Sequence, residues 1–185
     1  GLIESIIKNA YAGCMVKTLF DSKALIDLIH KEGSPDLLVL GIKISLSNGV
    51  DVLKTLRNKN NGYHYFPILM TADITELLVL TDAMGMGADD AITKPFNLKD
   101  FLQRCQKLIN YNLTIKDLKL NIKNLQYEAM INMCKMVEIK DGLTCEHLDR
   151  VAEFSYSIAL SVGVEKDKCE ILRYASKIHD IGKIH

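Results

Sequence analysis

The chain has 185 residues, enough for one large or two small domains. Lys+Arg and Asp+Glu are equal at 23 each, which argues against DNA and against an anionic membrane surface as partners. No apolar run approaches the roughly 20 residues that span a bilayer, no signal pattern opens the chain, and the five cysteines are scattered. We therefore expect a soluble, cytoplasmic protein with free thiols.

Residues 1–110 alternate short apolar runs with amphipathic helical patterns. The predicted strands are 14–19, 37–40, 67–70 and 90–93. The predicted helices are 2–12, a helix capped by Asp21, 50–57, 75–86, and a helix from Asn97 to about residue 109. Strands that alternate with helices at this spacing predict an α/β fold with a parallel sheet covered on both sides.

Several short motifs follow the predicted strands in a fixed order. They are Pro35-Asp36-Leu37-Leu38-Val39-Leu40, Asn48-Gly49, Met70-Thr71-Ala72, Gly87-Ala88-Asp89-Asp90 and Thr93-Lys94-Pro95-Phe96. Together they resemble the receiver domain of bacterial response regulators. The resemblance implies a flavodoxin-like sheet whose strand ends hold a phosphorylated Asp, a Mg²⁺ ion, a Thr and a Lys. Thr71 and Lys94 stand at the last two positions.

The position of the phosphoaccepting Asp in that family is Gly41 here. Glycine has no side chain that could accept a phosphoryl group. Because the carboxylate is absent, Mg²⁺ also lacks one of its ligands. The usual Pro four residues later is Ser45, and the aromatic switch position is Ala91. We therefore interpret residues 1–110 as a pseudo-receiver, in which Thr71 acts as a capping residue and Lys94 precedes a cis Pro95.

The first, central strand of the receiver fold has no counterpart among these residues, because the sequence opens on a helical pattern; either native residues precede Gly1 or the sheet is rebuilt. Buried backbone groups need hydrogen-bond partners. We therefore expect residues 15–19 to pair directly with residues 37–40, or a partner's strand to insert between them.

Residues 111–137 contain no Pro or Gly and predict a connecting helix. Its apolar residues are Ile115, Leu118, Ile122, Leu125 and Ala129. Their spacing of 3, 4, 3 and 4 is that of a short coiled coil, and a step of 4 to Met133 adds a stutter. Two heptads also fit a helix that packs on its own domain. We expect a homodimer, formed through this helix or through exposed apolar faces.

From residue 138 onward the pattern is helical, and two histidines stand out. His147 opens one helix, and His179-Asp180-Ile181-Gly182-Lys183 ends the next. An adjacent imidazole and carboxylate can bind one divalent cation. Residues 138–151 and 179–184 together resemble the start of an HD-GYP domain, a subfamily of the HD phosphohydrolases. The predicted division is a receiver-like domain at 1–110, a connecting helix at 111–137 and the N-terminal part of an HD domain at 138–185.

The HD-GYP resemblance implies two or three metal ions, iron or manganese, and hydrolysis of cyclic di-GMP. It makes His147 and His179 metal ligands, Asp180 the bridging carboxylate that activates water, and Lys183 a phosphate contact. Leu143 and Glu146 depart from the family pattern, and its later ligands lie beyond residue 185. We therefore expect this stretch alone to bind metal weakly and to hydrolyse nothing.

Three functional hypotheses remain. The first is a two-component-type signalling protein that hydrolyses cyclic di-GMP under the control of an unphosphorylatable receiver. The second is a catalytically inactive signalling and dimerisation module. The third is an HD phosphohydrolase that acts on another nucleotide. His30, His64 and His185 belong to no constellation, and we expect them at the surface.

Overall fold

The computed structural model describes residues 2–44, 47–58, 61, 65–140, 146–179 and 181–183. The chain divides into two units, residues 1–116 and 117–185, with the division inside one helix, α5 (Leu98–Lys140). The predicted turn at 141–144 lies outside the described residues, as do Ser45, His64 and His185. Described His30 is exposed, as expected. The three-part division at 110 and 137 stays a prediction.

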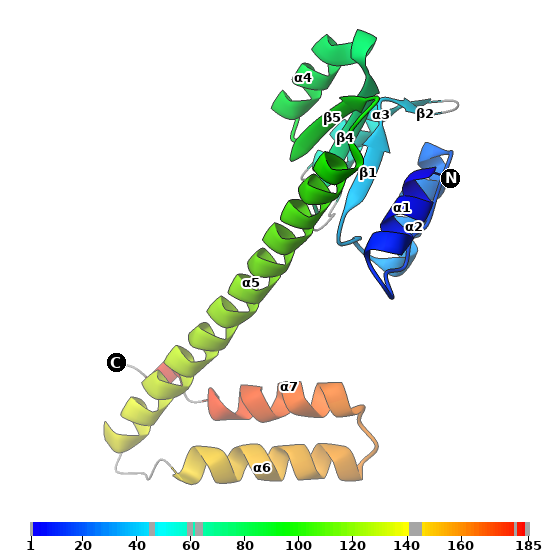
Figure 1. Cartoon of the computed structure of the whole chain (residues 1–185). Coiled ribbons are helices and arrows are strands. Elements are labelled where there is room, and N and C mark those ends of the chain that lie inside the picture. Colours follow the sequence, from blue (N-terminus) through cyan, green and yellow to red (C-terminus); the bar gives the residue numbers. More distant parts are fainter. Residues whose placement is uncertain are drawn as a thin grey trace. The chain divides into compact units, whose positions relative to one another are not determined.

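Three parallel strands form the sheet of the first unit (Figure 1). They are β1 (Leu38–Gly41), β4 (Ile68–Asp73) and β5 (Asp90–Lys94), in the order β1-β4-β5. The first five residues of the central strand β4 are buried, which explains its continuous apolar sequence. A small antiparallel pair, β2 (Lys43–Ile44) and β3 (Ser47–Asn48), was not predicted.

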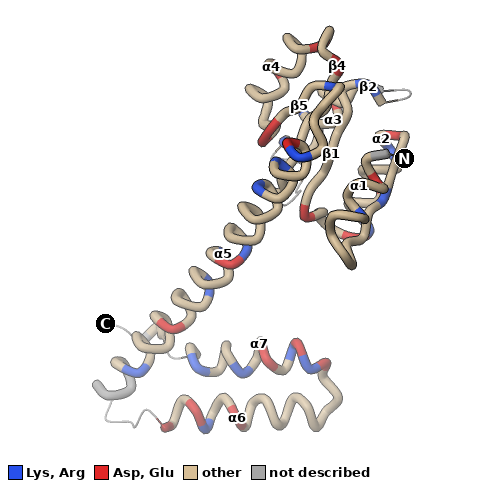
Figure 2. Tube along the Cα trace, viewed as in Figure 1, with Lys and Arg blue, Asp and Glu red and all other residues tan. Residues whose placement is uncertain are grey.

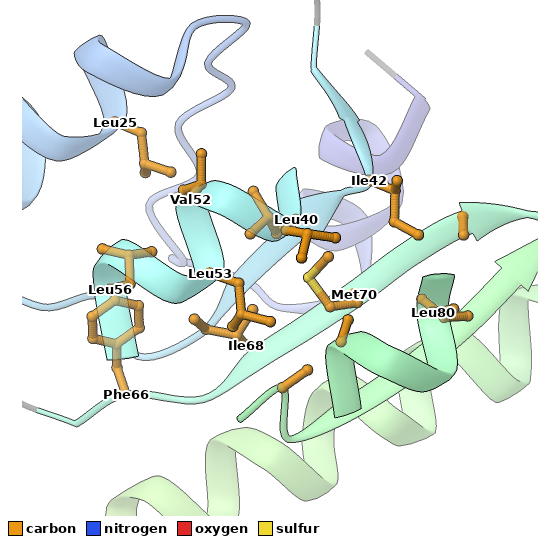
Figure 3. Close-up of a cluster of buried hydrophobic side chains, with 14 of the residues drawn as sticks. Leu25, Leu40, Ile42, Val52, Leu53, Leu56, Phe66, Ile68, Met70 and Leu80 are labelled. Carbon is orange, nitrogen blue, oxygen red and sulfur yellow. The ribbon is translucent and has the colours of Figure 1, made fainter. Parts of the chain in front are cut away.

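Helices cover both faces of this sheet. Side chains of α1 (Leu2–Ala10) and the first part of α5 pack on one face, around Leu69 and Phe101. Helices α2 (Ser22–Glu32), α3 (Gly49–Arg57) and α4 (Leu77–Gly85) contribute to the cluster on the other face (Figure 3). A short 3-10 helix, η2 (Ile74–Glu76), links β4 to α4. The predicted two-sided α/β fold is confirmed.

The predicted pairing of residues 15–19 with residues 37–40 is wrong. Residues 14–19 are irregular, and Met15 is 82% exposed. Side chains hold this segment to the neighbouring helices, since Lys17 pairs with Glu32 and the Thr18 hydroxyl donates to Glu4. These contacts fix the segment to α1 and α2, so it adds no strand to the sheet.

Strand β1 is consequently an edge strand of the described sheet. The amides of Leu38 and Ile42 donate to Pro67 and Thr71, both at distances of 2.9 Å. Because a strand's amides alternate in direction, those of Val39 and Gly41 point away from β4. No strand of the described residues pairs with that edge.

The second unit contains the end of α5, a hairpin of α6 (Glu146–Ser161) and α7 (Lys166–Lys177), and the short η3 (Ile181–Lys183). Gly163 turns the hairpin at φ 82°, in the left-handed region that glycine tolerates. Leu148, Ala152 and Ala159 of α6 and Cys169 of α7 are buried. The two helices predicted at 97–109 and 111–137 therefore form one, because neither Pro nor Gly separates them.

The expectations from composition concern thiols and membrane spans. The four described cysteines, Cys14, Cys105, Cys134 and Cys169, are free, and burial raises the pKa of Cys105 to about 11. Among the described residues, no helix has both the length and the apolar character that crossing a membrane requires.

Candidate functional site

The carboxyl ends of β1 and β4 bring Gly41 and Thr71 side by side in register. A Cβ atom added to Gly41 would lie 3.7 Å from Thr71 Oγ1 and 3.2 Å from the Lys43 carbonyl oxygen. A side chain at position 41 would therefore start beside the buried Thr71 hydroxyl. Glycine supplies no carboxylate there, so this position cannot accept a phosphoryl group.

Near this strand end, an ion pair joins Lys43 to Glu76, whose side chain is only 13% exposed. Lys43 Nζ lies 2.8 Å from Glu76 Oε1, and the Asp73 amide donates to Glu76 Oε2 at 3.1 Å. The hydrogen bond from Lys43 and then that from Asp73 hold the pKa of Glu76 below its usual value. Lys94, which is exposed at the end of β5, adds a weaker attraction. The positive charge of Lys94 thus acts on the Glu76 carboxylate, whereas position 41 carries no carboxylate.

Helix α3 starts in direct backbone contact with the end of β1. The Gly49 amide donates to the Ile42 carbonyl oxygen at 2.6 Å, and Asn48 Oδ1 accepts from the Val50 amide at 2.9 Å. A Cβ atom on Gly49 would lie 2.0 Å from the Gly41 carbonyl oxygen. Only glycine fits this approach, which gives the Asn48-Gly49 motif its structural reason.

Asp89 ties together three segments near the start of β4. Its Oδ2 accepts from the Ile68 amide and from Arg57 Nη2, both at 2.7 Å, and its Oδ1 accepts from the Tyr65 hydroxyl. Arg57 Nε also donates to the Gly87 carbonyl oxygen at 2.7 Å. Partial burial, and then the Asp89 hydrogen bond, raise the pKa of Tyr65. This network positions α3 against β4 and β5, and sequence reasoning missed it.

In the second unit, two predicted metal ligands lie close together. The His147 ring, in the first turn of α6, has its centroid 6.5 Å from that of His179, which follows α7. With metal–nitrogen bonds of about 2.0 Å in tetrahedral geometry, two imidazoles on one ion have centroids about 5 Å apart. The observed separation is larger, so the two rings would have to approach each other by roughly 1.5 Å to share one ion.

The backbone orients the second of these rings. His179 Nδ1 lies 2.8 Å from the Ser176 carbonyl oxygen, within hydrogen-bond distance. Such a contact selects the tautomer with a proton on Nδ1, and Nε2 is then the nitrogen that can coordinate a metal. A backbone contact of this kind is common behind metal-binding histidines.

Ion pairs link α6 and α7 near the two histidines. Lys177 Nζ lies 2.6 Å from Asp149 Oδ1, and Arg173 pairs with Glu153. The hydrogen bond from Lys177 lowers the pKa of Asp149. These pairs lie within one or two turns of the histidines and were not predicted.

The remaining predicted site residues cannot be placed. Asp180 lies outside the described residues, and so does the side chain of Lys183, whose backbone belongs to η3. Within the described part of the chain, no group of three or more His, Cys, Asp or Glu side chains could hold a metal. Of the proposed ligands, the two that the structure describes, His147 and His179, lie close together.

Comparison with known families identifies the first unit. The response regulator receiver domain family matches residues 1–106. The chain belongs to the response regulator receiver family. This match confirms the flavodoxin-like fold of the first unit and a place in response regulator signalling. The described remainder of the chain is mostly helical.

Curated relatives from several bacteria share this domain. The cyclic di-GMP phosphodiesterase response regulator RpfG of Xanthomonas campestris pv. campestris is 22% identical over 166 residues, covering 82% of this chain and 44% of RpfG. The regulatory protein VanRc of Enterococcus gallinarum is 32% identical, and the match covers 56% of this chain and 42% of VanRc. KdpE of Mycobacterium tuberculosis is 31% identical, and the match covers 60% of this chain and 47% of KdpE. The chain spans less than half the length of each of these relatives.

Solved structures agree on the fold of the first unit. The NtrX receiver domain of Brucella abortus has a TM-score of 0.52 at 22% identity, covering 59% of this chain and 88% of that domain. The receiver domain of a Luxo repressor protein of Vibrio parahaemolyticus has a TM-score of 0.53 at 17% identity, and the match covers 63% of this chain and 85% of that domain. At these identities the likeness concerns the fold alone.

Proposed function

We propose that this response regulator is a metal-dependent phosphohydrolase that acts on cyclic di-GMP. In this proposal the receiver controls the enzyme without phosphorylation of residue 41. The observation that carries the proposal is the proximity of His147 and His179, whose rings lie 6.5 Å apart although 32 positions separate them in sequence. The alignment with RpfG supports it, since it covers 82% of the chain and so extends past the receiver match, which ends at residue 106.

The residues present fit a divalent cation. Imidazole nitrogen suits iron and zinc, and a carboxylate such as that of Asp180, which follows His179 directly in sequence, suits manganese. A bound metal ion would lower the pKa of a water molecule and stabilise charge on the phosphodiester. In this scheme His147 and His179 bind the cation, Asp180 orients the attacking water, and Lys183 contacts a phosphate oxygen. Hydrolysis then breaks one P–O ester bond.

Metal binding by the chain tests this assignment. Titration calorimetry with Mn²⁺ should show binding that weakens at least about 10-fold in both His147→Ala and His179→Ala. His30→Ala is the matched control, because His30 lies in α2 of the other unit and should leave the affinity unchanged. If all three variants and the unaltered chain bind Mn²⁺ with equal affinity, the proposed metal site is wrong.

A second candidate, a catalytically inactive signalling and dimerisation module, is favoured by one observation. Gly41 removes the phosphoacceptor, so at least the receiver has lost the family's chemistry. Manganese binding that fails to depend on either histidine would favour this alternative. The third hypothesis, a different nucleotide substrate, is separated from the first by assaying other nucleotides beside cyclic di-GMP.

A further inference from the structure

Helices α6 and α7 form a hairpin that is closed at one end and open at the other. Gly163 lies in the turn at the closed end, where the Val164 amide donates to the Ala159 carbonyl oxygen at 3.0 Å. Both histidines lie at the open end, His147 in the first turn of α6 and His179 two residues after α7. The separation of their rings therefore depends on how far the two helices splay at that end.

The length of α6 makes this separation sensitive to a small change in the angle between the helices. His147 and Ser161, the last residue of α6, are 14 positions apart, which corresponds to about 21 Å along the helix axis. A tilt of about 4° at the turn consequently moves the open end by about 1.5 Å. This displacement equals the approach that the two rings need to share one ion. A link between the helices at the open end would therefore control the geometry of the histidine pair.

An ion pair forms such a link. Lys177 Nζ of α7 lies 2.6 Å from Asp149 Oδ1 of α6, and the lysine side chain is only 22% exposed. Asp149 follows His147 by two residues, within the same helical turn. Lys177 precedes His179 by two residues. Each member of the pair thus lies on the backbone segment that carries one of the histidines.

A second ion pair lies nearer to the turn. Arg173 of α7 pairs with Glu153 of α6, so basic residues of α7 lie beside acidic residues of α6 along this part of the hairpin (Figure 2). Both members are one helical turn farther from the histidines than Lys177 and Asp149 are. Of these two pairs, the one between Lys177 and Asp149 therefore has the more direct control over the open end.

We propose that Lys177 and Asp149 are positioning residues, whose ion pair holds the open end of the hairpin so that His147 and His179 bind one divalent cation together. Neither residue needs to touch the cation, since each acts through the helix that carries its neighbouring histidine. This inference rests on the proposed metal site and adds two residues to which the resemblance to HD phosphohydrolases gives no role.

The opposite charges of the two residues separate positioning from a purely electrostatic effect. An ammonium group repels a nearby cation, so charge alone predicts tighter cation binding in Lys177→Met. A carboxylate attracts a nearby cation, so charge alone predicts weaker binding in Asp149→Asn. If the pair positions the helices, each change breaks the same link, and both variants bind the cation more weakly.

Titration calorimetry of the full chain with Mn²⁺ tests the proposal. Lys177→Met and Asp149→Asn should each weaken binding about 10-fold, a loss typical of residues that orient metal ligands. Lys177→Arg should restore most of the affinity, because a guanidinium also pairs with a carboxylate. Lys168→Met is the matched control, since Lys168 also lies in α7 and pairs with Glu165, but at the closed end of the hairpin. A Lys177→Met variant that binds Mn²⁺ as tightly as the unaltered chain, or more tightly, would overturn the proposal.

Hydrogen exchange of the metal-free chain tests the link without the cation. Lys177→Met should speed exchange several-fold in peptides from the start of α6 and the end of α7, and Lys168→Met should not. Unchanged exchange in both variants would also overturn the proposal. If the two histidine-to-alanine variants weaken Mn²⁺ binding and Lys177→Met does not, the metal site stands and the positioning role is wrong. If Mn²⁺ binding is independent of both histidines, the proposed metal site and this inference are both wrong.

Discussion

Replacing Gly49 with alanine should lower the free energy of unfolding of the receiver unit by about 3 kcal/mol. The new Cβ would lie 2.0 Å from the Gly41 carbonyl oxygen, a backbone atom that no side-chain rotation can move away. Relief requires α3 to shift from β1, which strains the hydrogen bond from the Gly49 amide to Ile42 and the Asn48 cap. Urea denaturation, with hydrogen exchange of β1 and β4 peptides as a local probe, measures the loss.

Gly85→Ala provides a control of opposite sign. Gly85 ends α4, and a Cβ atom there would meet no atom within 4 Å. Alanine in a helix is favoured over glycine by about 0.5 to 1 kcal/mol, so this variant should be as stable as the unaltered chain or slightly more stable. If the Gly49→Ala and Gly85→Ala variants have the same free energy of unfolding, that result would contradict the close approach of α3 to β1.

Replacing Asp89 with alanine should lower the free energy of unfolding of the receiver unit by about 3 kcal/mol, the second large effect. The change leaves Arg57, whose side chain is 16% exposed, without its carboxylate partner. It also deprives the Ile68 amide and the Tyr65 hydroxyl of their acceptor. Removing one partner from a largely buried charged network costs more than the pair contributes, because the remaining charge stays desolvated.

Asp100→Ala is the matched control for Asp89→Ala. Asp100 also accepts from an arginine, Arg104, at 3.0 Å, but its side chain is 49% exposed. Exposed pairs contribute about 0 to 1 kcal/mol, so the change in unfolding free energy should stay within that range. Thermal unfolding of the two variants side by side measures the difference, and equal losses would contradict the role given to Asp89.

The central strands could be predicted from the sequence because burial on both faces leaves a direct pattern. Residues 67–70 are continuously apolar, and β4 there is fully buried between helices. Residues 14–19 gave a similar short pattern, yet no strand forms. Whether such a run joins a sheet depends on a neighbouring strand to pair with, and here Lys17 and Thr18 bind helix side chains instead. Local sequence does not encode that competition.

The candidate sites divide in the same way. The resemblance to receiver domains implied that positions 41 and 71 lie together at the strand ends, and the register places Gly41 beside Thr71. The ion pair of Lys43 with Glu76 could not be foreseen, because the two residues meet only after β2 and η2 have been placed. The proximity of His147 and His179 was expected through family resemblance alone. Periodicity places both on helices but cannot bring those helices together.

The most direct test of the proposed function is turnover of cyclic di-GMP. The enzyme for this test is a polypeptide that contains this chain and extends to the length of relatives such as RpfG, assayed with Mn²⁺ or Fe²⁺. We predict hydrolysis that falls at least about 100-fold in both His179→Ala and Asp180→Ala and does not change when acetyl phosphate and Mg²⁺ are added. Negligible turnover that is equal in the unaltered protein and both variants would contradict the proposed phosphodiesterase and favour a signalling module without catalysis.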